Sequence, residues 1–273
     1  MGLRINTNIE AIQIHGQLVD SGKHIADSLR KLSSGKRIVS AKDDAAGYTV
    51  ANKFRSDISC LRVAYQNASE AQSLLSLADG SYNKIHDILV RMKDLATQAA
   101  SGQTPTGMLN SEFQLLQSEI DRIANSTKYS PTALINQDQN MTFQVGQQNG
   151  TDFQLTIGLK GATSTHLGVN AAVVDITDTA HAQSAMDLLD TALSSINGYM
   201  GTVGAYQTRL QYTMENLAAT IENFSASESS IRDVDMALEV TNFTKDQILQ
   251  QSGMAMLAQA NAAPQQILSL LRG

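Results

Sequence analysis

The chain has 273 residues, a formal net charge of −6, 5% aromatic residues and no tryptophan. This acidic balance, without a basic stripe interleaved with aromatics, argues against nucleic acid as a partner. The chain has no apolar run of about 18 residues, so we expect no membrane span. The single cysteine, Cys60, excludes an internal disulfide and a cysteine-based zinc site. Because it directly precedes the apolar position Leu61, we expect a buried, inert thiol.

Residues 1 to about 40 are predicted to form a helical arm that is interrupted at Ser33–Gly35 and again at Ser40. The apolar residues of this arm are Ile5, Ile9, Ile12, Leu18, Ile25, Leu29 and Leu32.

Two later stretches of equal length, residues 61–99 and 186–224, carry apolar residues at alternating spacings of three and four. Gln207 is the one polar exception. This spacing is the heptad seam of packed helices. A third seam spans residues 109–123, beyond a turn-rich loop at 101–107. Residues 61–99 and 109–127 are therefore expected to form an antiparallel helical hairpin, which residues 180–224 close into a bundle.

Between the helices the apolar period changes to two. Residues 141–145 and 152–157 alternate around the loop Gly146–Gly150, which predicts a β-hairpin at about 141–157. The small and polar residues from 158 to 179 are expected to form a loop, too short for a catalytic domain.

The segment 247–273 has one charged side chain, Arg272, yet it is rich in apolar residues. It could dock as a helix on its own domain, or it could fold only against neighbouring copies of the chain. We favour the second interpretation, because the sequence offers little other globular material on which it could dock.

The sequence shows no pattern of catalytic or cofactor-binding residues. The five histidines form no ligand-spaced cluster, and no nucleophile elbow or phosphate-binding loop is present. Asp43 and Asp44 are adjacent on a polar turn, so their side chains diverge, and a solvated role or a contact between subunits is more plausible than catalysis. We expect no enzymatic activity, no cofactor and no metal.

Several segments resemble bacterial flagellin. At the amino end the match is Leu32–Gly47, LSSGKRIVSAKDDAAG, and at the carboxyl end it is Ser230–Glu239, SIRDVDMALE, with Met256–Gln266, MLAQANAAPQQ. Val203–Leu210 also matches, with Thr208 where the family has Asn. The order and spacing of these matches extend over nearly the whole chain.

The resemblance implies a mainly α fold: an elongated antiparallel helical bundle, or coiled coil, with one small β-hairpin. It implies two terminal arms, residues 1–42 and 235–273, that pair as the inner filament core. It also implies a helical rod domain at 43–234. The implied function is that of a structural subunit that self-assembles into the extracellular flagellar filament for motility, with terminal helices that fold on assembly. A hook–filament junction protein is the alternative, since it shares flagellin-like termini.

The partners implied by the resemblance are further copies of the chain, the flagellar cap, an export chaperone and the hook-associated proteins. The missing secretory signal agrees with export through the flagellar type III channel. The residues expected to carry assembly contacts are Ile5, Ile9, Ile12, Leu29, Leu32, Asp43, Asp44, Ile248, Leu249, Met256, Leu257, Leu268 and Leu271.

The family's rod also carries a patch that Toll-like receptor 5 of vertebrates recognises. The matching positions in this sequence are Arg91, Leu95, Gln98 and Glu112. Val90, Lys93–Asp94 and Leu116 depart from the family pattern, so recognition by the receptor and a plain helical surface are both open interpretations.

Overall fold

The computed structural model describes residues 7–103 and 105–272, and it describes side chains as far as Ala262. The chain divides into two compact units. One unit comprises the residues up to Ser56 together with those from Asn223 onward, and the other comprises Asp57–Glu222. Two long helices, α2 (Ala45–Ala100) and α4 (Thr179–Arg232), contribute residues to both units. The prediction of a mainly α fold is confirmed.

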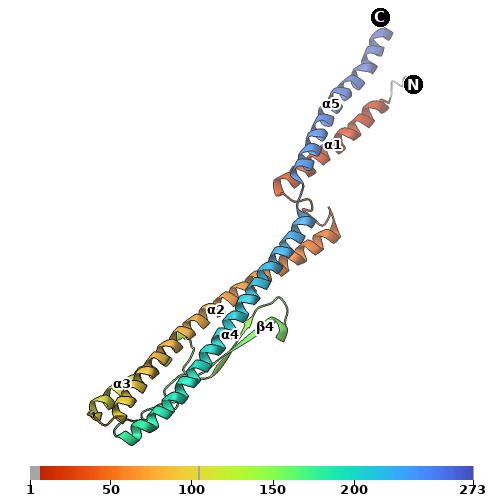
Figure 1. The fold of residues 1–273 in the computed structure, drawn as a ribbon. Helices are drawn as coiled ribbons and strands as arrows, with labels where there is room; N and C mark the ends of the chain where they lie inside the picture. Colours follow the sequence, from red (N-terminus) through yellow and green to blue (C-terminus); the bar gives the residue numbers. More distant parts are fainter. Residues whose placement is uncertain (1–6, 104, 273) are drawn as a thin grey trace. The chain divides into compact units, whose positions relative to one another are not determined.

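The unit with the termini contains the paired helices α1 (Ile9–Ser34) and α5 (Met236–Arg272) (Figure 1). The Asn8 side chain caps α1 by accepting a hydrogen bond from the Ala11 amide. Gly35 ends α1 in the left-handed conformation, with φ 67°, which a residue without a Cβ adopts most readily. The predicted interruption at Ser33–Gly35 is therefore confirmed.

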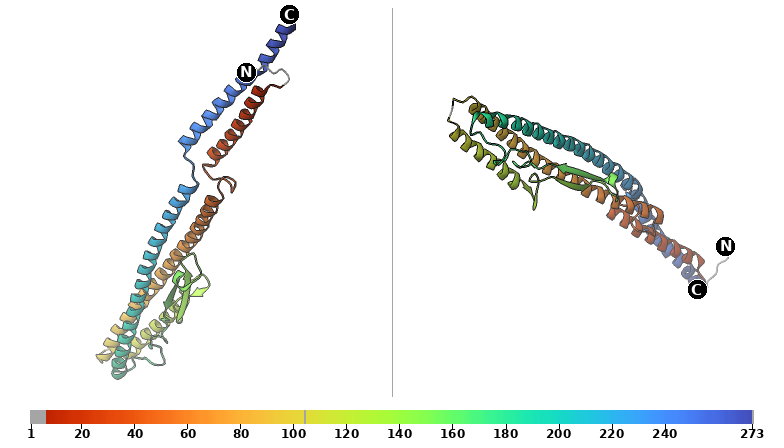
Figure 2. Two further views of the ribbon diagram at one scale, coloured as in Figure 1. Left: turned by 90° about the vertical axis from the view of Figure 1, so that its right-hand side faces the viewer. Right: turned by 90° about the horizontal axis from the view of Figure 1, so that it is seen from below.

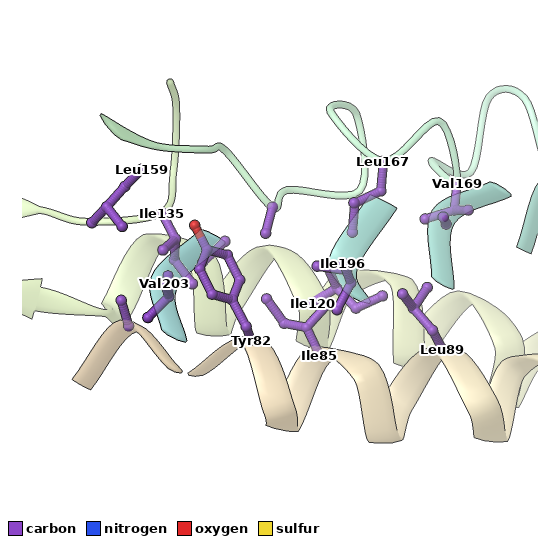
Figure 3. Close-up of a cluster of buried hydrophobic side chains, with 14 of the residues drawn as sticks. Tyr82, Ile85, Leu89, Ile120, Ile135, Leu159, Leu167, Val169, Ile196 and Val203 are labelled. Carbon is purple, nitrogen blue, oxygen red and sulfur yellow. The ribbon is translucent and has the colours of Figure 1, made fainter. Parts of the chain in front are cut away.

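In the other unit, α3 (Thr106–Ser126) lies beside α2 and α4, as the views in Figures 1 and 2 show. Every apolar position of the predicted seam in residues 61–99 is buried. Figure 3 shows how the core combines side chains of α2, α3 and α4, such as Tyr82, Ile120 and Ile196. The predicted bundle of residues 61–99, 109–127 and 180–224 is confirmed. Among the described residues, no helix is long and apolar enough to cross a membrane.

The predicted β-hairpin is present as β3 (Gln139–Gln144) and β4 (Gln154–Leu159), which pair antiparallel with Met141 opposite Ile157. A short 3₁₀ turn, η1 (Thr151–Phe153), precedes β4. The structure adds a second pair that the sequence did not indicate, β1 (Lys128–Tyr129) with β2 (Thr132–Ala133). Two-residue strands are too short to show an alternating pattern, and the tight turn between them holds Ser130 at φ 56°.

The connection from Lys160 to Asp178 was expected to be a loop, and it contains no helix or strand. It nevertheless supplies apolar side chains to the core, including Leu167 and Val169 (Figure 3). Polar side chains of α3 hold its backbone. Gln117 donates hydrogen bonds to the carbonyls of Val169 (2.9 Å) and Val174 (3.0 Å). The connection is thus a packed layer of this unit.

Candidate assembly surface

The α1–α5 pair is built from an inner row of α5 residues spaced alternately by four and three. A Cβ built on Gly253 would lie 3.5 Å from the Leu18 side chain, so this row faces α1. At one end of the pair, the Lys31 amine lies 4.0 Å from the Glu239 carboxylate, and at the other the Asn8 amide donates to the Ala260 carbonyl at 2.8 Å. The inner row consists of Glu239, Phe243, Asp246, Gln250, Gly253, Leu257 and Ala260.

Much of this inner row is polar or small, so α1 and α5 bury little apolar surface between them. Eleven large apolar side chains of the two helices lie instead in solvent, each between 44% and 63% exposed. We call these residues the apolar arm surface: Ile9, Ile12, Val19, Leu29, Met236, Leu238, Val240, Ile248, Leu249, Met254 and Met256. So many exposed apolar side chains on two paired helices are typical of an interaction site.

Six of the thirteen assembly residues proposed from sequence belong to this surface. Leu32 and Leu257 are partly buried instead. Ile5 and the side chains of Leu268 and Leu271 lie outside the described residues. The residues that the structure places on the apolar arm surface are Ile9, Ile12, Leu29, Ile248, Leu249 and Met256. Their role in contacts between copies remains a prediction.

Asp43 and Asp44 are both engaged within their own chain. One Asp43 carboxylate oxygen accepts hydrogen bonds from the amides of Val39 (3.1 Å) and Ser40 (2.9 Å), and the other accepts from Arg30 (3.2 Å). The Ser40 amide is the main cause that lowers the pKa of Asp43 below its usual 3.8. Asp44 accepts from the amides at the start of α2 and so caps that helix. A contact of either carboxylate with a neighbouring copy remains a prediction.

The residues matching the receptor patch do not all lie on the surface. Arg91 donates to one carboxylate oxygen of Glu112 through Nε (3.0 Å) and Nη2 (2.8 Å), and both side chains are about half exposed. Gln98 is exposed as well. Leu95 is fully buried in the core that α2 forms with α3 and α4. The structure therefore offers Arg91, Gln98 and Glu112 to a partner.

A groove that the sequence did not reveal runs between α4 and the tip of the β3–β4 hairpin. Its volume is about 720 Å³, and its apolar lining includes Leu61, Val145, Phe153, Leu155 and Leu217. Arg209 and Asp152 supply charge to the same groove. The alternation in 141–157 predicted the hairpin, but no local sequence pattern indicates a groove beside it.

The expectation of a buried Cys60 is wrong: its side chain is exposed. A residue that directly precedes a seam position points about 100° away from it around the helix, and here that direction faces solvent. Across the described ranges, no group of three or more histidine, cysteine or acidic side chains is arranged to hold a metal ion.

Comparisons with known proteins identify relatives over nearly the whole chain. The family model of the bacterial flagellin N-terminal helical region matches residues 5–140, and that of the C-terminal helical region matches 186–271. A flagellin of Halalkalibacterium halodurans is 39% identical over 272 residues, which is 98% of this chain and 99% of that protein. A flagellin of Bacillus subtilis is 35% identical over 306 residues, covering 99% of this chain and all of that protein.

Two further relatives extend the comparison. The flagellar filament 33 kDa core protein of Treponema phagedenis is 36% identical over 98% of this chain and 99% of its own length. The crystal structure of Bacillus cereus flagellin has 31% sequence identity and a TM-score of 0.47, covering 56% of this chain and 88% of that chain.

Proposed function

The chain belongs to the bacterial flagellin family, and from this premise we propose that its apolar arm surface drives its polymerisation into the flagellar filament. As a member of this family the chain is a structural subunit of an extracellular filament and not an enzyme, and it assembles with further copies of itself. The relatives reported above are flagellins and filament core proteins, so the junction-protein alternative finds no support among them.

The observation that carries the proposal is the exposure of large apolar side chains on α1 and α5. Covering the remaining half of one such side chain stabilises the covered state by about 1 kcal/mol. Several of them buried together would exceed the free energy available from exposed ion pairs, which are typically worth about 0–1 kcal/mol each. Apolar contact is therefore the larger driving force for assembly.

The proposal includes the division of the chain into two arms, 1–42 and 235–273, and a rod, 43–234. Identical subunits that meet through unlike surfaces form a ring if the rotation between them closes, and a helical filament if it does not; the proposal takes the second case. Because the α1–α5 contact buries few large side chains, the arms gain most of their apolar burial from neighbours. This supports coupling between the folding of the terminal helices and assembly.

The finer partners are also proposed. A soluble subunit with an exposed apolar arm surface needs protection before export, which suits an export chaperone that covers α5. The cap and the hook-associated proteins would contact the growing and the basal ends of the filament. Recognition by Toll-like receptor 5 would use Arg91, Gln98 and Glu112, since Leu95 is buried. A cell reporter assay without a response to purified monomer would exclude this receptor.

The experiment that tests the main proposal is seeded polymerisation of the full-length chain, examined by electron microscopy. The variant carries three aspartates on the apolar arm surface, I248D, L249D and M256D. The matched control carries the same added charge at exposed polar positions of α5, Q251D, S252D and Q259D. We expect filaments from the control and none from the variant, while circular dichroism shows that both remain helical.

Two results would overturn the proposal. Normal filaments from the apolar variant would show that these side chains do not drive assembly. Failure of the control as well as the variant would show that added negative charge, and not lost apolar contact, blocks the filament.

A further inference from the structure

The two connections that join the arm helices to α2 and α4 are hydrogen-bonded to each other. The Arg37 amide donates to the Arg232 carbonyl at 2.6 Å, and the Val234 amide donates to the Gly35 carbonyl at 3.1 Å. Lys36 and Asp233 face each other in an antiparallel bridge. The connection after α1 and the connection before α5 therefore form one small paired segment, which we call the linker pair (residues 35–38 and 231–234).

Arg232 lies at the centre of the linker pair. Its carbonyl also accepts from the Ile38 amide at 3.4 Å, and its guanidinium carbon lies 5.7 Å from the centre of the Tyr48 ring in the first turn of α2. This distance is within the range of a cation–π contact. Arg232, the last residue of α4, thus contacts both the connection after α1 and the start of α2.

The guanidinium of Arg232 is buried but not fully paired. Its side chain is 8% exposed, and neither Nε nor Nη1 has a hydrogen-bond acceptor. Leaving buried donors of a charged group unpaired is unfavourable, so such groups almost always have a partner. Nothing in the α4 helix or the Tyr48 ring supplies an acceptor at hydrogen-bond distance.

The carboxylate that can supply this acceptor is that of Glu228, one turn earlier on α4. Its Oε1 lies 3.7 Å from Arg232 Nη1, and its side chain is 25% exposed. A side-chain rotation that moves this oxygen by about 1 Å would therefore form a charge-assisted hydrogen bond. Asp43, Asp44 and Asp235 are already engaged with backbone amides of turns and caps. Glu228 is therefore the acceptor that remains within reach on the same helix.

We propose that Glu228 and Arg232 form an ionic latch that holds the linker pair closed, so that α1 and α5 move as one body. When the latch is closed, the Arg232 carbonyl accepts hydrogen bonds from the amides of Arg37 and Ile38. When the latch is open, the hydrogen bonds between the two segments of the linker pair are lost together. Arg232 is a positioning residue in this device. The proposal rests on the proposed function only in treating α1 and α5 as assembly arms.

The test is amide hydrogen exchange of the full-length monomer, followed at the Arg37 and Val234 amides, in E228Q, R232K and the double variant. We expect exchange at both amides to rise about tenfold in each single variant, which corresponds to the loss of one hydrogen bond to a charged group. We expect no further rise in the double variant, because both changes open the same latch. D233N is the control, since it removes a negative charge from the linker pair itself, and we expect it to leave exchange at both amides unchanged.

Three results would overturn the latch. Unchanged exchange in E228Q would exclude Glu228 as the acceptor, and a rise in D233N equal to that in E228Q would show a general charge effect. Unequal responses of Arg37 and Val234 would show that the two strands open separately. If R232K fails to fold, the comparison of E228Q with D233N still decides the question. Because exchange is measured on the monomer, the result is independent of whether the apolar arm surface drives polymerisation.

Discussion

Two leucines of α4, four residues apart, should differ strongly in their contribution to stability. Leu189 is fully buried, whereas Leu193 is only partly buried at the edge of the same core. Replacing a fully buried leucine by alanine leaves a cavity and typically costs 2.7–5.0 kcal/mol, so we expect L189A to destabilise its unit by about 3 kcal/mol. Water can fill the space left at Leu193, so L193A should cost about 1 kcal/mol.

The assay is native-state hydrogen exchange of the full-length monomer, read from peptides within residues 57–222. This measurement reports the free energy of opening of that unit by itself, whereas a single melting curve would mix it with the unit that contains the termini. Equal losses for the two variants, or a larger loss for L193A, would refute the reasoning. Such a result would mean that the row Leu189, Ile196, Val203, Leu210 and Leu217 does not face the core.

Two further predictions concern polar side chains of the same unit. Q117L removes both hydrogen bonds from α3 to the connection 160–178. Amide exchange around Val169 and Val174 should therefore rise by an amount equivalent to about 2 kcal/mol. The control Q114L, on the exposed face of α3, should change this exchange little. The hydrogen bond to Asp178 raises the pKa of His181 above 6.5. The stability that the His181–Asp178 interaction contributes is therefore fully present below about pH 6.5. It is lost as the pH rises through the raised pKa of His181. Protection of the first turn of α4, corrected for intrinsic exchange, should fall over that range, and D178N should weaken the dependence, with Asp175 retaining part of it.

The helices and the β3–β4 hairpin could be predicted from sequence because each has a repeating apolar pattern. The seam in residues 61–99 fixed both the type of element and the face that is buried. A glycine marked one helix end, as Gly35 shows at the end of α1. Where a segment lacks a period, as in the connection 160–178, its contribution to the core could not be predicted. Its backbone is held by Gln117 and Asp121, polar side chains that the heptad rule assigns to no partner.

Exposure of single residues was harder to predict than the elements that carry them. Cys60 and Leu95 each directly precede a seam position, at Leu61 and Ala96, yet one is exposed and the other fully buried. The difference comes from the number of elements that pack against α2 at each position along its length. Near Leu95 the helix also packs against α3, which widens its buried face, whereas α3 does not extend to the level of Cys60. The number of neighbours depends on tertiary packing, which the local sequence does not encode.

The same dependence on neighbours accounts for the surfaces that this chain leaves uncovered. The seams of α2 and α4 look alike in sequence, and α2 buries every position of its seam. In α4, the seam positions that are buried are only Leu189, Ile196, Val203, Leu210 and Leu217. The arms carry the imbalance further, because α1 and α5 hold more apolar residues than one partner helix can cover. In a chain that forms a filament, some apolar positions become buried only when the copies assemble. We therefore propose that the excess of apolar positions over available neighbours within one copy marks the surfaces where further copies bind.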